Sequence, residues 1–170
     1  MSMVLAFFSD MLFFILLLWL ACAASVFIHE MGHAMGYMLA AKSTGWQITI
    51  GSGKNIVRSK RWVVNLLPFG GLFLPVGKDR LDPKRKQIAM LAGGPLATLL
   101  LLVPLVALRM NFTTLEQLNI GNYDAVECFV RFVLYYNLIM LVVAIFPSAY
   151  PFGICKGLAS DGLQIYRLLK

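Results

Sequence analysis

A His-Glu-Met-Gly-His segment at residues 29–33 carries the residue types and spacing of a metal-dependent hydrolytic site. Residues four apart lie on one face of a helix, so His29 and His33 can place ring nitrogens on one metal ion. Two imidazoles and a carboxylate suit zinc, which in enzymes keeps one position for water. Glu30 can reach that water and pass its proton to a leaving amine. The segment predicts a site for one Zn²⁺ ion with Glu30 as general base.

The setting of this segment strengthens the prediction. It lies in the most apolar third of the chain, where an ionisable side chain inside a membrane span costs about 2.5–3.5 kcal/mol and is retained mainly for function. His29 and His33 are also the only two histidines. In a soluble helix the His-Glu-x-x-His pattern often occurs by chance. Its position in an apolar, membrane-spanning segment is therefore what favours metal binding.

The composition indicates a membrane protein. Of the 170 residues, 59% are hydrophobic and 14% are charged, whereas a soluble domain has about half and about a quarter. The formal charge is +7, but ten of the fifteen Lys and Arg residues lie between Lys42 and Lys86. Basic residues between apolar runs indicate a cytoplasmic membrane loop rather than a nucleic-acid-binding face. The three widely spaced cysteines predict neither a disulfide nor a thiol metal site.

We predict a mainly α-helical membrane protein with three transmembrane helices, and a single domain at residues 1–170. The first helix contains the His-Glu-Met-Gly-His segment, and it is not a cleavable signal peptide because no basic residue precedes Lys42. The three helices are expected at about 4–41, 86–108 and 127–146, and a tail follows at 148–170.

A small β-hairpin and a re-entrant segment are predicted at residues 46–77, between the first two helices. WQITI and NIVRS flank GSGK, which predicts a hairpin at Trp46–Ser59. The apolar stretch that follows is broken by proline and glycine, and such backbone must line a cavity or lie at the membrane interface. We hypothesise that an exposed strand edge at Ile48, Thr49 and Ile50 binds an unwound substrate segment by β-strand addition.

The positions of the basic residues also predict the orientation. The segment from Lys42 to Lys86 holds ten, and the tail after Pro147 holds three. The N-terminus and the loop from Met110 to Glu127 hold none. By the positive-inside rule the N-terminus is outside and the C-terminus is in the cytoplasm. His29, His33 and the tail then meet in the cytoplasmic half of the membrane.

A third metal ligand is expected among the remaining acids. Four of them lie on the opposite side of the membrane in this topology: Asp10, Glu116, Asp124 and Glu127. Asp79 and Asp82 lie among lysines and arginines, where a solvated salt-bridged turn explains them. Asp161 remains, on the correct side and among apolar residues. Its alternative role is to cap the N-terminus of a short terminal helix.

Five motifs in order resemble the site-2 protease family of intramembrane zinc metalloproteases. They are FIHEMGHAMGY, ITIGSGK, LLPFGGLF, AMLAGGPLATLL and SDGLQI. The resemblance runs almost end to end and corresponds to the family's catalytic core without its PDZ or nucleotide-sensing CBS domain. It implies that His29, His33 and Asp161 bind one zinc ion and that Glu30 is the base.

Two positions depart from the family pattern. The family reads Asn-x-x-Pro-x-x-x-x-Asp-Gly, whereas here Asp161 lies fourteen positions after Pro147. Alignment on that proline places Ala144 where the family has its asparagine. Asn137 matches a second, upstream asparagine and is a candidate for positioning substrate. Its alternative role is an interhelical hydrogen bond.

The resemblance implies hydrolysis of a peptide bond in a transmembrane or membrane-anchored protein near the cytoplasmic face. The expected partners are that substrate, the lipid bilayer, and an accessory membrane protein or a second copy, with no nucleic acid. The expected location is the cytoplasmic membrane, as a multi-pass protein. The alternatives are an inactive zinc-binding homologue, which the intact Glu30 disfavours, and a transporter core. Transport would require more intramembrane ionisable groups than Glu30 and Arg131.

Overall fold

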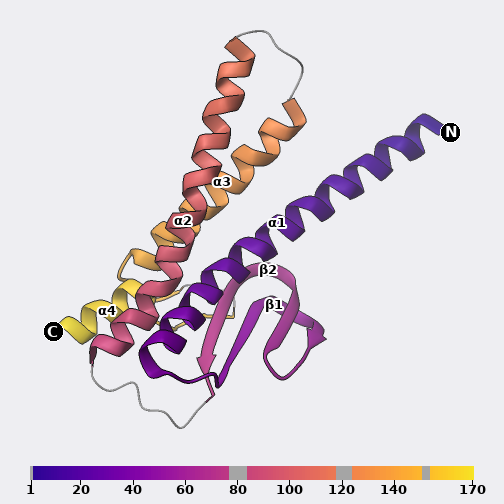
Figure 1. The fold of residues 1–170 in the computed structure, drawn as a ribbon. Coiled ribbons are helices and arrows are strands. Elements are labelled where there is room, and N and C mark those ends of the chain that lie inside the picture. The colour runs from indigo at the N-terminus through magenta and orange to yellow at the C-terminus, as the bar shows by residue number, and fades with distance from the viewer. Residues whose placement is uncertain (1, 77–83, 118–123, 151–153) are drawn as a thin grey trace.

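The computed structural model describes residues 2–76, 84–117, 124–150 and 154–170. Its elements in chain order are α1 (Ser2–Ala41), β1 (Trp46–Arg58), β2 (Trp62–Pro75), α2 (Lys84–Gln117), α3 (Asp124–Ile145) and α4 (Asp161–Leu169) (Figure 1). Within the described residues, α1, α2 and α3 are long and apolar enough to cross a membrane. The predicted fold class is confirmed: the protein is mainly α-helical, with three membrane-spanning helices and an antiparallel pair of strands between the first two.

Helix α2 is longer than predicted. It begins at Lys84 and continues past Leu108 to Gln117, through a segment expected to be a polar loop. The reason is that the residues after Leu108 include no proline or glycine before Gly121, so nothing in them stops the helix. The predicted charged turn with Asp79 and Asp82 lies outside the described residues.

Helices α1 and α2 cross with their backbones in direct contact. A Cβ atom added to Gly32 would lie 2.7 Å from the Cβ of Ala97 and from the carbonyl carbon of Gly93. One turn further along α1, a Cβ atom on Gly36 would lie 2.9 Å from the Cα of Met90. Larger residues would push the helices apart. These glycines therefore fix the crossing point and turn the histidine face of α1 toward α2.

The three long helices separate toward one end of the molecule. Helices α2 and α3 lie side by side, whereas the N-terminal part of α1 diverges from them (Figure 1). Side chains from Met3 to Leu16 are largely exposed and apolar, as lipid-facing residues are. Buried Glu127 of α3 connects α3 to α2, because its carboxylate lies 2.8 Å from Arg109 Nη1 and also pairs with Arg131.

The two strands form an antiparallel hairpin between α1 and α2, as predicted, but its turn does not lie at GSGK, so the predicted bounds Trp46–Ser59 are wrong. The GSGK segment bends β1 at Gly51 and Gly53, both with positive φ, and the turn between the strands comes after Arg58. Residues 46–50 pair with 71–75 on one side, and 48–50 pair with 62–64 on the other. The outer edge at 71–75 makes no pairing with another strand among the described residues.

This pairing also corrects the expected free edge at Ile48, Thr49 and Ile50. All three residues pair with β2 on both sides. Their side chains are buried, and Ile48 and Ile50 belong to a core cluster with Val26, Tyr37 and Trp46. An additional strand cannot bind where both edges are already hydrogen-bonded.

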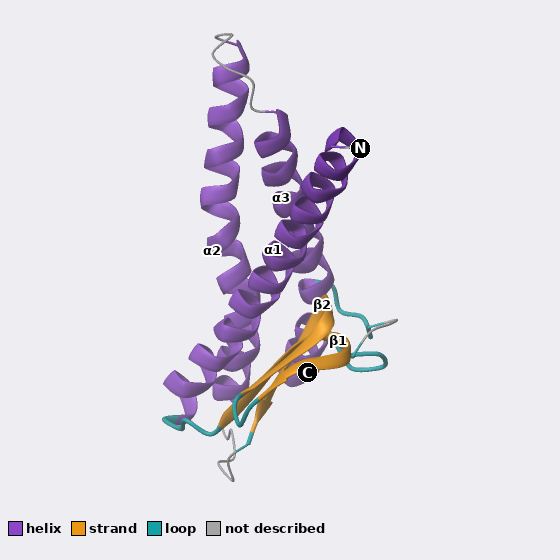
Figure 2. Cartoon of the chain, turned by 90° about the vertical axis from the view of Figure 1, so that its right-hand side faces the viewer, coloured by secondary structure: helices purple, strands orange, loops and turns teal. Residues whose placement is uncertain are grey.

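The sheet lies against the C-terminal half of α1 (Figure 2), which brings it to the level of the histidines. Two side chains hold the bend in β2. Trp19 Nε1 of α1 donates to the carbonyl of Leu66 over 2.6 Å, and the Tyr136 hydroxyl of α3 donates to the carbonyl of Pro68 over 3.0 Å. The middle of β2 is therefore held by two membrane-spanning helices.

Candidate active site

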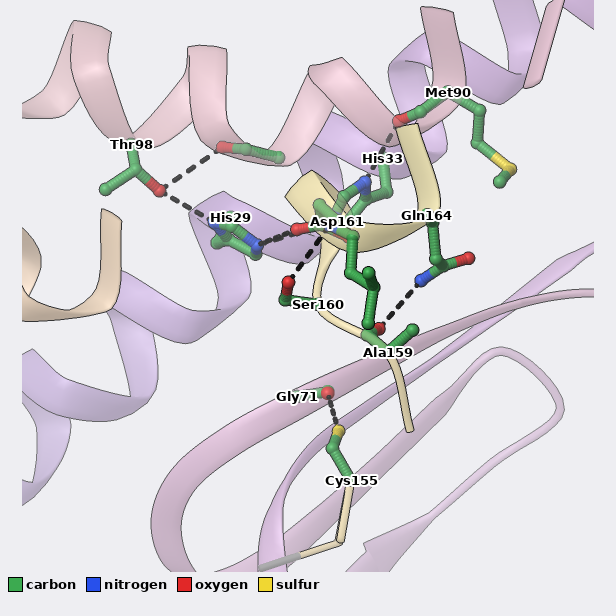
Figure 3. Close-up of polar contacts among 12 residues, drawn as sticks. His29, His33, Gly71, Met90, Thr98, Cys155, Ala159, Ser160, Asp161 and Gln164 are labelled. Atoms are coloured by element: carbon green, nitrogen blue, oxygen red, sulfur yellow. Dashed lines mark hydrogen bonds and ion pairs between the residues drawn. The ribbon is translucent and has the colours of Figure 1, made fainter. Parts of the chain in front are cut away.

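His29, His33 and Asp161 meet in one buried cluster, formed by α1 and the first residue of α4 (Figure 3). The two Nε2 atoms are 3.3 Å apart, and each lies 3.4 Å from Oδ2 of Asp161. The three residues are 6–7% exposed. Within the described residues, no other group of three or more His, Cys, Asp or Glu side chains has a geometry that could hold a metal ion.

Helix α2 orients both imidazole rings. His33 Nδ1 lies 2.9 Å from the carbonyl oxygen of Met90, which can only accept a hydrogen bond, so Nδ1 carries the proton. His29 Nδ1 lies 2.8 Å from Thr98 Oγ1, whose hydroxyl donates to the Gly94 carbonyl over 3.2 Å. That hydroxyl oxygen therefore accepts from His29. Both Nε2 atoms then present lone pairs toward Asp161.

This donor set fits a zinc ion. Tetrahedral ligands at about 2.0–2.1 Å from zinc are separated by about 3.3 Å, which matches the 3.3 and 3.4 Å separations between the three ligand atoms. Asp161 Oδ2 is buried and has no hydrogen-bond partner. Two nitrogen lone pairs and a carboxylate oxygen in contact repel one another unless a cation lies between them. His29, His33 and Asp161 could therefore form a metal site.

The segment between α3 and α4 explains how Asp161 reaches the histidines despite its distance from Pro147. Its two ends pair with each other: Ala149 bridges to Ala159, and the Ser160 amide donates to the Ser148 carbonyl over 2.9 Å. Ser148 and Ala149 thus lie beside Ala159 and Ser160, next to the end of α3. This pairing keeps the start of α4 beside the end of α3, although Asp161 follows Pro147 by fourteen positions.

The alternative role of Asp161 as a helix cap is wrong, because Ser160 holds that position. Ser160 has extended backbone, and its hydroxyl accepts from the Leu163 amide over 3.2 Å. The same hydroxyl donates to the Phe146 carbonyl over 2.6 Å. With the cap provided by its neighbour, the Asp161 carboxylate is turned away from its own helix and toward α1.

Glu30 lies beside this cluster, against Gly71 of β2. It is 5% exposed, and a Cβ atom on Gly71 would lie 2.6 Å from Glu30 Cγ. Glu30 and His29 line two adjoining cavities, of about 110 and about 320 Å³. The smaller one also contains His33 and Asp161 in its wall. A carboxylate beside a metal-binding cluster, in a cavity that can admit a reactant, is placed as a general base requires.

The family profile described as peptidase family M50 matches residues 15–160. The chain belongs to peptidase family M50. The matched region contains the His-Glu-Met-Gly-His segment and ends one residue before Asp161. This agrees with the site-2 protease resemblance of the sequence, and M50 membership implies an intramembrane metalloprotease. A search of curated proteins finds no match.

Three residues of α2 that support the M50 site were not predicted. Thr98 and the Met90 carbonyl orient the imidazoles. Gly94 leaves room for them, since a Cβ atom there would lie 2.6 Å from His33 Cε1 and 2.8 Å from His29 Nε2. The sequence feature that could have revealed them is the AMLAGGPLATLL motif, whose paired glycines and single threonine stand in an otherwise apolar stretch.

The predicted substrate-binding residues of the M50 protein do not line either cavity. Asn137 is fully buried and donates to Ser25 Oγ of α1 over 2.9 Å and to the Val133 carbonyl over 2.8 Å. It makes the interhelical hydrogen bond that was its alternative role. Ile48, Thr49 and Ile50 lie inside the sheet. Ala144, at the position of the family's asparagine, does line the larger cavity.

Proposed function

We propose that this protein is an intramembrane zinc endopeptidase that cuts a transmembrane or membrane-anchored protein near the cytoplasmic face. The observation that carries the proposal is the meeting of two imidazole nitrogens and one carboxylate oxygen within 4.8 Å of one another, next to Glu30 on a membrane-spanning helix. Such residues inside a membrane span are retained for function.

His29, His33 and Asp161 would hold the zinc ion. When bound, zinc lowers the pKa of a water molecule and polarises a carbonyl group. The Glu30 carboxylate takes a proton from the attacking water and delivers it to the nitrogen of the departing segment. Thr98 and the Met90 carbonyl keep the imidazoles in the tautomer that binds metal. These residues are buried in the protein, and their burial keeps bulk water away from the charges that form during the reaction.

The outer edge of β2 would hold the substrate backbone, in place of Ile48–Ile50. A peptide bond in a membrane helix is shielded by its own hydrogen bonds, so the substrate must be extended before it is cut. The Gly71 carbonyl accepts from Cys155 Sγ over 2.9 Å and so points away from β1. Backbone groups alternate along a strand, so those of Phe73 point the same way. Both residues line the smaller cavity with Glu30.

Orientation and partners follow from the charge distribution. The protein is an integral membrane protein. Basic residues cluster between Lys42 and Lys86, and we place this side in the cytoplasm, with the N-terminus outside. The metal cluster lies near the same end of α1, which puts the cut near the cytoplasmic face. The partners would be a membrane-protein substrate and an accessory membrane protein or second copy.

An inactive homologue is the main alternative, and one comparison separates it from an enzyme. Wild type, Glu30→Gln and Asp10→Asn are purified in detergent, their zinc content is measured, and each is tested on a library of single-span substrates. Asp10 is exposed near the start of the same helix and serves as the matched control. We expect equal zinc in all three, and cleavage by the wild type and Asp10→Asn alone.

Two results would contradict the proposal. Equal cleavage by Glu30→Gln would remove Glu30 as the base. Zinc bound equally well after His33→Ala and Asp161→Asn would show that the metal site lies elsewhere.

A further inference from the structure

The larger cavity, of about 320 Å³, has no role in the chemistry described so far. Glu30 and His29 form a small polar part of its wall, and the rest is mostly apolar. The apolar residues come from α1, β2 and α3 and include Val26, Phe69, Ile139, Met140, Val143 and Ala144. A cavity of this size with a few polar groups at one end is typical of a ligand-binding site.

The two cavities adjoin each other along β2 and share part of their walls. Residues 71–73 line the smaller cavity and residues 69–71 line the larger one, so Gly71 belongs to both walls. Glu30 also belongs to both. An extended segment bound along this edge would pass Glu30 and the metal cluster on its way from one cavity to the other. Its side chains would alternate in direction, and one beside the reacting bond would enter the larger cavity.

The walls of the larger cavity suit an apolar occupant. Val26 and Ala144 are 1% and 2% exposed and form a buried part of the wall. Phe69 and Ile139 are exposed, and Ile139 belongs to a helix that is long and apolar enough to cross a membrane. Water fills an apolar cavity poorly, whereas a side chain entering from a transmembrane segment is itself apolar.

We propose that this cavity is the subsite for one large apolar side chain of the substrate, of the leucine, methionine or phenylalanine class, next to the bond that is cut. Ala144 sets its depth, because its methyl group is the smallest side chain that α3 contributes to the wall. The proposal rests on the proposed function and adds to it a preference for large over small side chains.

The experiment uses single-span peptides that are identical except for the residue on each side of the cut bond, which is alanine, leucine or phenylalanine. Cleavage is measured for wild type, Ala144→Leu, Ala144→Val and Ala125→Leu. Ala125 is exposed at the other end of α3 and provides the matched control. Zinc content verifies that each variant is folded. A parallel series measures binding of the labelled peptides to Glu30→Gln, with and without Ala144→Leu.

We expect wild type to prefer leucine or phenylalanine over alanine at one of these positions by about tenfold in kcat/KM. Ala144→Leu should bring this ratio close to one, Ala144→Val should give an intermediate ratio, and Ala125→Leu should keep the wild-type ratio. A wild-type ratio near one, or an unchanged ratio in Ala144→Leu, would overturn the subsite. The second result would indicate that the preference is set by another part of the protein.

The binding series separates this proposal from the proposed function. If wild type cut none of the peptides, the protease assignment would fail, and binding alone would decide on the subsite. About tenfold tighter binding of the leucine peptide than of the alanine peptide, lost on Ala144→Leu, would support it. Equal binding of all peptides would overturn it.

Discussion

His29 Nδ1 lies 2.8 Å from Thr98 Oγ1, although 69 positions separate the two residues in the chain. This contact fixes the ring so that Nε2 faces the metal site. Thr98→Val keeps the shape of the side chain and removes the hydroxyl. Loss of such a partner typically lowers metal affinity by about 10- to 100-fold, and we expect that decrease in zinc affinity by competition with a chelator. Thr98→Ser should retain wild-type affinity, and an unchanged affinity in Thr98→Val would contradict the assigned role.

Ser160→Ala should weaken the metal site without touching a ligand. The hydroxyl caps α4 and donates to the Phe146 carbonyl, so its loss should lower stability by about 1–2 kcal/mol and loosen the position of Asp161. The readouts are thermal unfolding in detergent and zinc retention. Ser9→Ala, at an exposed position of α1, is the control and should behave as wild type. A normal zinc content at reduced stability would limit Ser160 to a role in folding.

Gly93→Ala should disrupt the crossing of α1 and α2. The added methyl group would lie 2.7 Å from the carbonyl carbon of Gly32, and overpacking of this kind costs about 1–3 kcal/mol. We expect a lower midpoint of thermal unfolding together with lower zinc content, because both histidines lie on this helix face. Ala107→Val enlarges an exposed position of the same helix and should change neither quantity. A wild-type midpoint in Gly93→Ala would mean that the helices can separate at no cost.

Cys155 should react with a maleimide much more slowly than exposed Cys128. Burial, followed by the charges of Glu30 and Asp161, raises the pKa of the Cys155 thiol from 9.0 to about 11. The thiolate is the reactive form, so at pH 7.5 its population is about a hundredfold below that of an ordinary thiol. In a variant with Cys155 as the single cysteine, the rate should rise about tenfold per pH unit up to about pH 10. A plateau near pH 8 would contradict the raised pKa.

The sequence alone predicts the features of this protein that depend on local geometry and composition. The positions of His29 and His33 on one helix face follow from the helical repeat, and the three membrane-spanning helices follow from long apolar runs. Family membership is also readable from the motifs. None of these features depends on which distant segments come into contact.

The features that only the tertiary structure decided depend on such contacts. Asp161 faces the histidines because Ser148 and Ala149 pair with Ser160 and Ala159, and because Ser160 takes the capping position. Ile48–Ile50 have no free edge because β2 pairs with them on both sides, which leaves the outer edge of β2 beside Glu30. A strand's neighbours and a carboxylate's direction are set by hydrogen bonds between residues far apart in the chain, and no local pattern determines them.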